Sequence, residues 1–178
     1  MKEQKEFTIP FVGLKIGEHT YNFEINNTFF EDFEYDEFND ANIHLEVLLN
    51  KKTTLLEFSL SFKGSVNVNC DTTNEPYNQE VNGQCHFVVN FGEEFNDENE
   101  DILILPHGSH EVNIQQYIYE SIVLAMPTRR VHPGIEDGTL KSEILEKLEE
   151  LSPRLETETG EESTDPRWDD LKKLLTDK

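Results

Sequence analysis

Apolar and polar residues alternate over much of residues 5–92, and this period of two restricts the fold more than any other feature. In Ile43–Leu49 and Leu56–Phe62 every second residue is apolar, and shorter sets of the same kind surround Ile9 and Phe23. Alternation of this kind is typical of strands that bury one face only. Turn residues separate the runs at short intervals. The pattern predicts an antiparallel β-meander or a partly open barrel.

The last two strands of this region are predicted over Tyr77–Val81 and Cys85–Phe91. Asn82-Gly83 lies between them and favours a two-residue hairpin turn, because both residue types tolerate a positive φ.

Five aromatic residues fall within an acidic segment: Phe29, Phe30, Phe33, Tyr35 and Phe38. We expect their rings to cover an edge or an open end of the sheet. A small ligand held among Phe29, Phe33, Tyr35 and Phe38 is the alternative, and the chain would then be a binding module.

A core helix is predicted after a short buried strand over residues 101–105. Asn113 and Gln116 have the spacing of an N-cap and its reciprocal partner, and Pro127 ends the segment. The helix is apolar nearly all round: Ile114, Tyr117, Ile118, Tyr119, Ile122, Val123, Leu124 and Ala125. Such a helix belongs inside the sheet. We therefore predict an α+β domain over residues 1–133.

Residues 134–178 are expected to form an acidic linker with short helices. Leu140, Ile144, Leu148 and Leu151 predict an amphipathic helix that starts after Thr139. A linker over 154–164 follows, and Asp165-Pro166 then starts a terminal helix that carries Trp168 and Leu171. This last helix either docks on its own domain or anchors a partner.

The chain has 15 Lys and Arg against 37 Asp and Glu, a net charge of −22. Binding to duplex DNA depends on lysine and arginine side chains that neutralise the phosphates, and this chain has few of them. We therefore predict no DNA partner. No apolar run approaches the ~20 residues of a transmembrane helix, and the charged N-terminus lacks a signal-peptide core, so we expect a cytoplasmic protein without a membrane partner. Acidic blocks are usually solvated surface, and the alternative is a surface that attracts basic partners.

The sequence contains no recognisable catalytic arrangement, and we predict that the protein is not an enzyme and needs no cofactor. It has no Gly-x-Ser-x-Gly motif and no phosphate-binding loop. His107, His110 and Glu111 could ligate a metal, but capping or surface roles suit them better. Cys70 and Cys85 lack the Cys-x-x-Cys spacing of zinc sites. We therefore expect no metal.

Three segments in series resemble the YceD family of large ribosomal RNA subunit accumulation proteins. Glu111–Pro127 resembles the family's helix that ends in Leu-Ala-Leu-Pro, and residues 165–175 resemble its closing Asp-Pro-Arg and Leu-Lys-x-Leu signature. Cys70–Tyr77 is similar to its Cys-x-Arg-Cys-x-x-Pro-Phe turn, with Thr73 in place of the second cysteine.

The resemblance implies a non-enzymatic ribosome assembly factor that supports accumulation of large-subunit ribosomal RNA. Its partner would be a pre-ribosomal large subunit or a basic ribosomal protein, and direct RNA contact stays open. A binding module unrelated to ribosomes is the alternative. The candidate partner-binding residues are two pairs of adjacent basic residues together with residues of the terminal motif. They are Arg129, Arg130, Arg167, Trp168, Leu171, Lys172 and Lys173.

Overall fold

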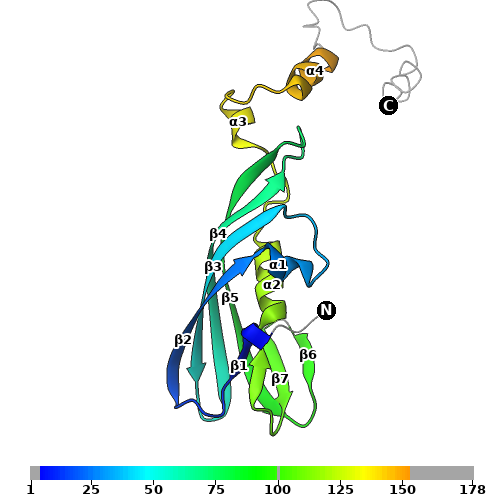
Figure 1. The fold of residues 1–178 in the computed structure, drawn as a ribbon. Coiled ribbons are helices and arrows are strands. Elements are labelled where there is room, and N and C mark those ends of the chain that lie inside the picture. Colours follow the sequence, from blue (N-terminus) through cyan, green and yellow to red (C-terminus); the bar gives the residue numbers. More distant parts are fainter. Residues whose placement is uncertain (1–4, 100, 153–178) are drawn as a thin grey trace, which may run out of the picture. The chain divides into compact units, whose positions relative to one another are not determined.

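The computed structural model describes residues 5–99 and 101–152. Its elements are a 3-10 turn η1 (Lys5–Phe7), β1 (Thr8–Pro10), β2 (Gly17–Asn26), α1 (Asn27–Glu31), β3 (Asp40–Lys51), β4 (Leu55–Asn69), β5 (Pro76–Gly92), β6 (Asn96–Asn99), β7 (Ile102–Pro106), β8 (Glu111–Asn113), α2 (Gln115–Leu124), α3 (Pro133–Glu136) and α4 (Glu143–Leu151) (Figure 1). None of the helices in these residues is long and apolar enough to cross a membrane.

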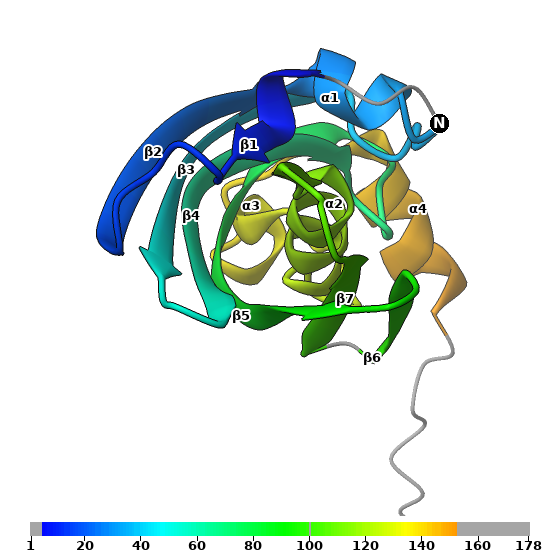
Figure 2. The same ribbon diagram turned by 90° about the horizontal axis from the view of Figure 1, so that it is seen from below.

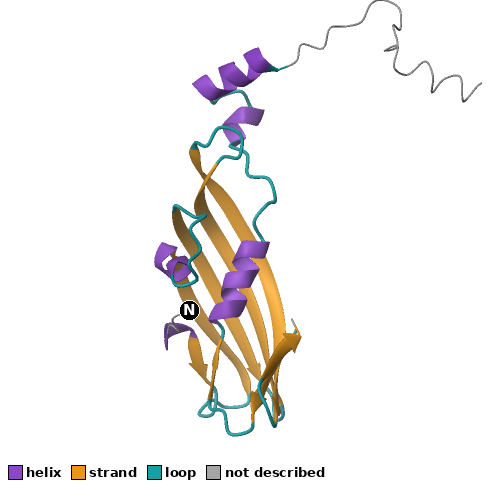
Figure 3. Cartoon of the chain, turned by 90° about the vertical axis from the view of Figure 1, so that its right-hand side faces the viewer, coloured by secondary structure: helices purple, strands orange, loops and turns teal. Residues whose placement is uncertain are grey.

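Six strands form one curved sheet in the order β2-β3-β4-β5-β7-β6, and α2 lies against its concave face (Figures 2 and 3). β1 and β8 form a separate two-stranded pair. The predicted α+β class and the partly open, curled sheet are confirmed. β5 and β7 run parallel, from Val88↔Ile102 to Gly92↔Pro106, so the sheet is mixed and not a pure antiparallel meander.

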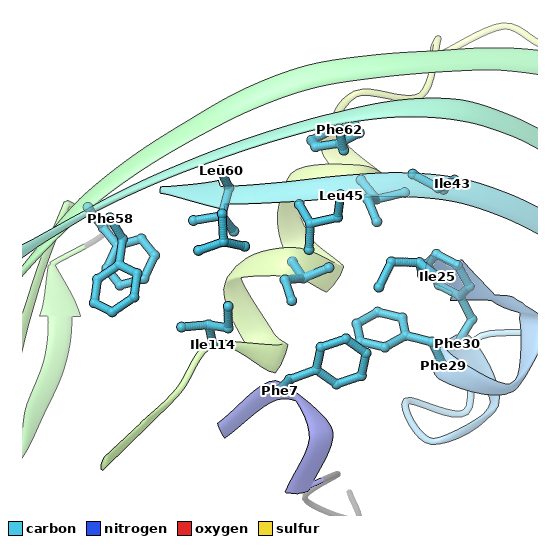
Figure 4. Packing of buried hydrophobic residues seen from close by; sticks show 14 of the residues in the cluster. Phe7, Ile25, Phe29, Phe30, Ile43, Leu45, Phe58, Leu60, Phe62 and Ile114 are labelled. Carbon is cyan, nitrogen blue, oxygen red and sulfur yellow. The ribbon is translucent and has the colours of Figure 1, made fainter. Parts of the chain in front are cut away.

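The core is the inward set of the alternating positions that the sequence indicates. In β3, Ile43, Leu45, Val47 and Leu49 are fully buried, and β4 contributes its own alternate residues. Figure 4 shows Ile43 and Leu45 of β3 and Leu60 of β4 on the side of the sheet that faces α2, with the rings of Phe29 and Phe30 near Ile25.

The predicted hairpin at Asn82-Gly83 is wrong, because β5 runs without a break through both residues. Gly83 pairs with Phe62 of β4, and a Cβ at Gly83 would lie 2.6 Å from the Phe62 ring. The missing side chain makes room for that ring on the inner face of the sheet. Gly64 of β4 allows a close approach of β3, since a Cβ there would collide with the Asn42 backbone oxygen.

The aromatic cluster packs at one end of the concave face and forms part of the core. Phe29, Phe30 and Phe38 are at most 3% exposed. The Phe33 ring stacks on Tyr119 of α2 with centroids 4.1 Å apart, and Phe30 meets Phe38 edge to face at 4.8 Å. The rings contact one another and α2, as expected of residues that cover an open end of the sheet.

The structure corrects three details of the predicted helices: the burial of one α2 side chain, the N-cap of α2 and the start of α4. Ile114, Ile118 and Ile122 are buried, but Leu124 is 83% exposed, so α2 is not covered all round. Asn113 accepts a hydrogen bond from the Gln115 backbone N–H, whereas the Gln116 side chain bonds Glu120 and not the cap.

The helix predicted from Leu140 begins later, at Glu143, with Ser142 as its N-cap. The Leu140 N–H instead bonds the Gly134 carbonyl and closes the turn after α3. The chain divides into two units, 1–141 and 142–178. In the second unit, α4 has an apolar stripe with Ile144 and Leu148 each 42% exposed.

Ile122→Ala is expected to lower the free energy of unfolding by ~2–5 kcal/mol, because the truncation leaves a cavity under α2. Leu124→Ala, two residues along the same helix, is the matched control and should change stability by less than ~0.5 kcal/mol, since that side chain is exposed. Urea unfolding of both variants measures the difference. Equal losses at the two positions would contradict the assigned core.

Candidate functional site

Arg129 and Arg130 follow α2, and the structure gives them different surroundings. Arg129 is exposed. The Arg130 Nη1 donates to Glu37 Oε2 at 2.7 Å, and its Nε lies 3.7 Å from Asp71 Oδ1. The backbones of Arg130 and Asp71 are also joined, since Asp71 N donates to the Arg130 carbonyl at 2.8 Å. The charge of Arg130 is therefore engaged within the protein, and the residue ties the segment after α2 to the turn after β4.

Arg167, Trp168, Leu171, Lys172 and Lys173 lie outside the described residues, and their partner-binding role stays a prediction.

The turn at residues 70–76 surrounds the Cys70 thiol with hydrogen-bond donors. Cys70 is 2% exposed, and the His132 backbone N–H points at its Sγ from 3.3 Å. Burial raises the pKa of the thiol, but hydrogen bonds from the Thr73 hydroxyl and from the backbone N–H groups of His132, Thr73 and Thr72 outweigh it and lower the pKa to about 7. Thr73, at the place of the second cysteine in the resemblance, is thus a donor to Cys70.

The structure brings His132, but not Cys85, next to the Cys70 thiol. The His132 Nδ1 accepts a hydrogen bond from Gly134 N at 2.9 Å, so that nitrogen is already engaged. Cys85 lies on β5, paired with Leu60, and contributes to a different part of the molecule. Within residues 5–99 and 101–152, no group of three or more His, Cys, Asp or Glu side chains could hold a metal ion.

Ionised Cys70 should stabilise the protein at alkaline pH. Its pKa lies near 7 in the folded chain against an ordinary value of 9.0, so folding favours the thiolate. The stabilisation is present above pH 9 and is lost as the pH falls through 7. We expect Cys70→Ala to cost more free energy of unfolding at pH 9 than at pH 6, as measured by urea titration at each pH. A cost independent of pH would contradict the donor arrangement.

A groove of about 950 Å³ lies between α2 and the strands β5, β7 and β6. Its floor is apolar and includes Leu103, Leu105 and Val112, which are 7% exposed or less. Two exposed apolar side chains stand at its margin, Phe95 at 58% and Leu124 at 83%. We call this concavity, with the lining described here, the α2 groove.

The walls of the α2 groove are acidic. Asp97 of β6, Asp101, Glu111 of β8 and Glu120 of α2 all line it, and none of the described lining residues is a lysine or arginine. The Tyr117 ring stacks on Phe87 at a centroid distance of 3.9 Å. Burial, followed by the negative charges of Asp97 and Glu120, raises the pKa of Tyr117 to about 12. Carboxylates from both walls therefore act on one point within the groove.

Comparison with known proteins gives one result. A family model described as large ribosomal RNA subunit accumulation protein YceD matches residues 58–175. The chain belongs to the YceD family. No curated protein and no solved structure gave a match. The matched range begins within β4 and includes the Cys70 turn, both walls of the α2 groove and the segment of Arg129 and Arg130.

The sequence did not predict the α2 groove in this YceD family protein. Residues 93–101 contain six acidic residues and no base, a pattern typical of solvated surface, and Glu111 and Glu120 lie outside any acidic block. The available signal was the placement of Gln116 and Glu120 four residues apart on a helix that otherwise looked apolar. That spacing marks one polar side of α2, and this side faces the groove.

Proposed function

We propose that this YceD family protein is a non-enzymatic factor that supports accumulation of large-subunit ribosomal RNA by binding an assembly intermediate of the large subunit. The family match over residues 58–175 carries the proposal. The α2 groove and the acidic surface supply a means of binding without catalysis.

A basic ribosomal protein, alone or within the intermediate, is the partner that the charge favours. The chain carries a net charge of −22, which repels RNA phosphates at long range and attracts lysine and arginine. Arg130 is engaged by Glu37 and Asp71, which leaves Arg129 as the exposed base of that doublet. Direct contact with RNA would depend on Arg129 together with the lysine and arginine residues of the terminal segment.

The tagged full-length protein is expected to sediment with precursor large-subunit particles, and its depletion should lower large-subunit ribosomal RNA relative to small-subunit RNA. Association should weaken as salt is raised, because attraction between exposed charges is screened beyond ~10 Å at 0.1 M. Mature subunits serve as the control. Unchanged RNA levels after depletion, with no particle association, would refute the proposal.

We also propose that Arg167, Trp168, Leu171, Lys172 and Lys173 contact the partner, since Trp and Arg are frequent interface anchors. Deleting residues 165–178 is expected to remove most of the particle association while changing the melting temperature of the remaining protein little. Sedimentation and thermal denaturation of the truncated chain test this. A large fall in melting temperature would instead mean that the segment stabilises the fold.

A further inference from the structure

One side of β5 lacks a strand partner where it borders the α2 groove. The whole length of β4 pairs with β5, from Leu55↔Asn90 to Asn69↔Pro76. On the other side β7 pairs only from Val88 onward, since β7 begins at Ile102. In the described chain, no strand continues this pairing toward residues 83–86, and these four residues line the groove.

An unpaired strand edge is a template for another extended chain. A strand laid beside residues 83–86 would continue the line of β7 beyond Asp101, whose carbonyl accepts a hydrogen bond from Val88 N at 2.8 Å. It would be about 13 Å long over these four residues, at ~3.3 Å per residue. Alternate side chains of the added strand would point toward α2 and the apolar floor, where Leu103 and Leu105 lie.

The charges at this edge select the occupant. Asp101 directly precedes β7, Asp97 lies on β6, and Glu120 lines the same groove from α2. An added strand rich in lysine and arginine would meet these carboxylates, whereas an acidic strand or a nucleic acid would be repelled. The exposed Phe95 and Leu124 offer contacts to an apolar residue that lies between the lysine and arginine residues of the added strand.

We propose that the α2 groove binds an extended, lysine- and arginine-rich segment of a partner protein, which adds as a strand to the free edge of β5 at residues 83–86. The inference rests on the proposed function and deepens it by assigning the site and the conformation of the basic partner. Basic tails that are unfolded in the free partner are of this chemical class.

The test uses the full chain and a fluorescent octapeptide that alternates Lys or Arg with Val. Asp97→Lys combined with Glu120→Lys is expected to weaken peptide binding by about tenfold or more. Glu18→Lys combined with Glu46→Lys is the matched control, because it makes the same charge change at exposed positions on β2 and β3, outside the groove lining. Fluorescence anisotropy at constant salt measures both. Equal weakening by the two pairs would show a bulk charge effect and overturn the proposal.

Backbone pairing is tested by N-methylation of the peptide. In an extended strand, the backbone N–H groups of every second residue point to the same edge. Methylation of the backbone nitrogens of every second residue therefore blocks one edge of the peptide and leaves its charge unchanged. We expect methylation of one set to abolish binding and methylation of the other to preserve it. Equal binding of both methylated peptides, or failure of the wild-type protein to bind the unmethylated peptide, would overturn the proposal.

The same variants in the particle sedimentation assay separate the two hypotheses. Loss of association with Asp97→Lys and Glu120→Lys, but not with the control pair, supports the groove as the site. Particle association that survives the groove variants overturns the groove while the assembly function stands. Absence of association of the wild-type protein refutes the function itself, whatever the peptide result.

Discussion

The mismatch in length between α2 and the sheet that it covers determines the rest of the structure. β4 has 15 residues and β5 has 17, so they span about 50 Å and about 56 Å at ~3.3 Å per residue. α2 has 10 residues and spans about 15 Å at 1.5 Å per residue. One helix therefore cannot bury the concave face of these strands. The aromatic cluster of Phe29, Phe30 and Phe38 covers a second part, and the α2 groove is a part that the described residues leave open.

The strands and the core were readable from the sequence because burial on one face imposes a period of two. The error at Asn82-Gly83 is instructive, since the evidence against the turn lay in the same pattern. Inward positions continue in step from Tyr77 and Val81 through Gly83 to Phe87, and a two-residue turn would have broken that register. Pairing with β4 along the whole of this stretch therefore outweighs the local turn preference of Asn82-Gly83.

The α2 groove was beyond reach from the sequence, because its walls come from separate segments. Asp97, Glu111 and Glu120 meet only after the sheet curls and the β6–β7 hairpin folds back. The parallel pairing of β7 with β5 likewise depends on contacts between distant segments, and no residue pattern within β7 predicts its partner or direction. By contrast, the importance of the Cys70 turn was indicated by the resemblance, although the role of Thr73 as a donor to the thiol needed the structure.

The segments that precede and follow α2 are both bound to other parts of the domain. Before the helix, β8 pairs with β1, and the Ile114 N–H bonds the Phe7 carbonyl at 3.1 Å. After it, Arg130 is bound by Asp71 and Glu37, and the His132 N–H bonds the Cys70 Sγ. A wall fixed in this way loses little conformational freedom when a ligand binds, so the entropy cost of association falls mainly on the partner. The two carboxylates that bind Arg130 thus hold the chain that follows α2 against the segments before β3 and after β4.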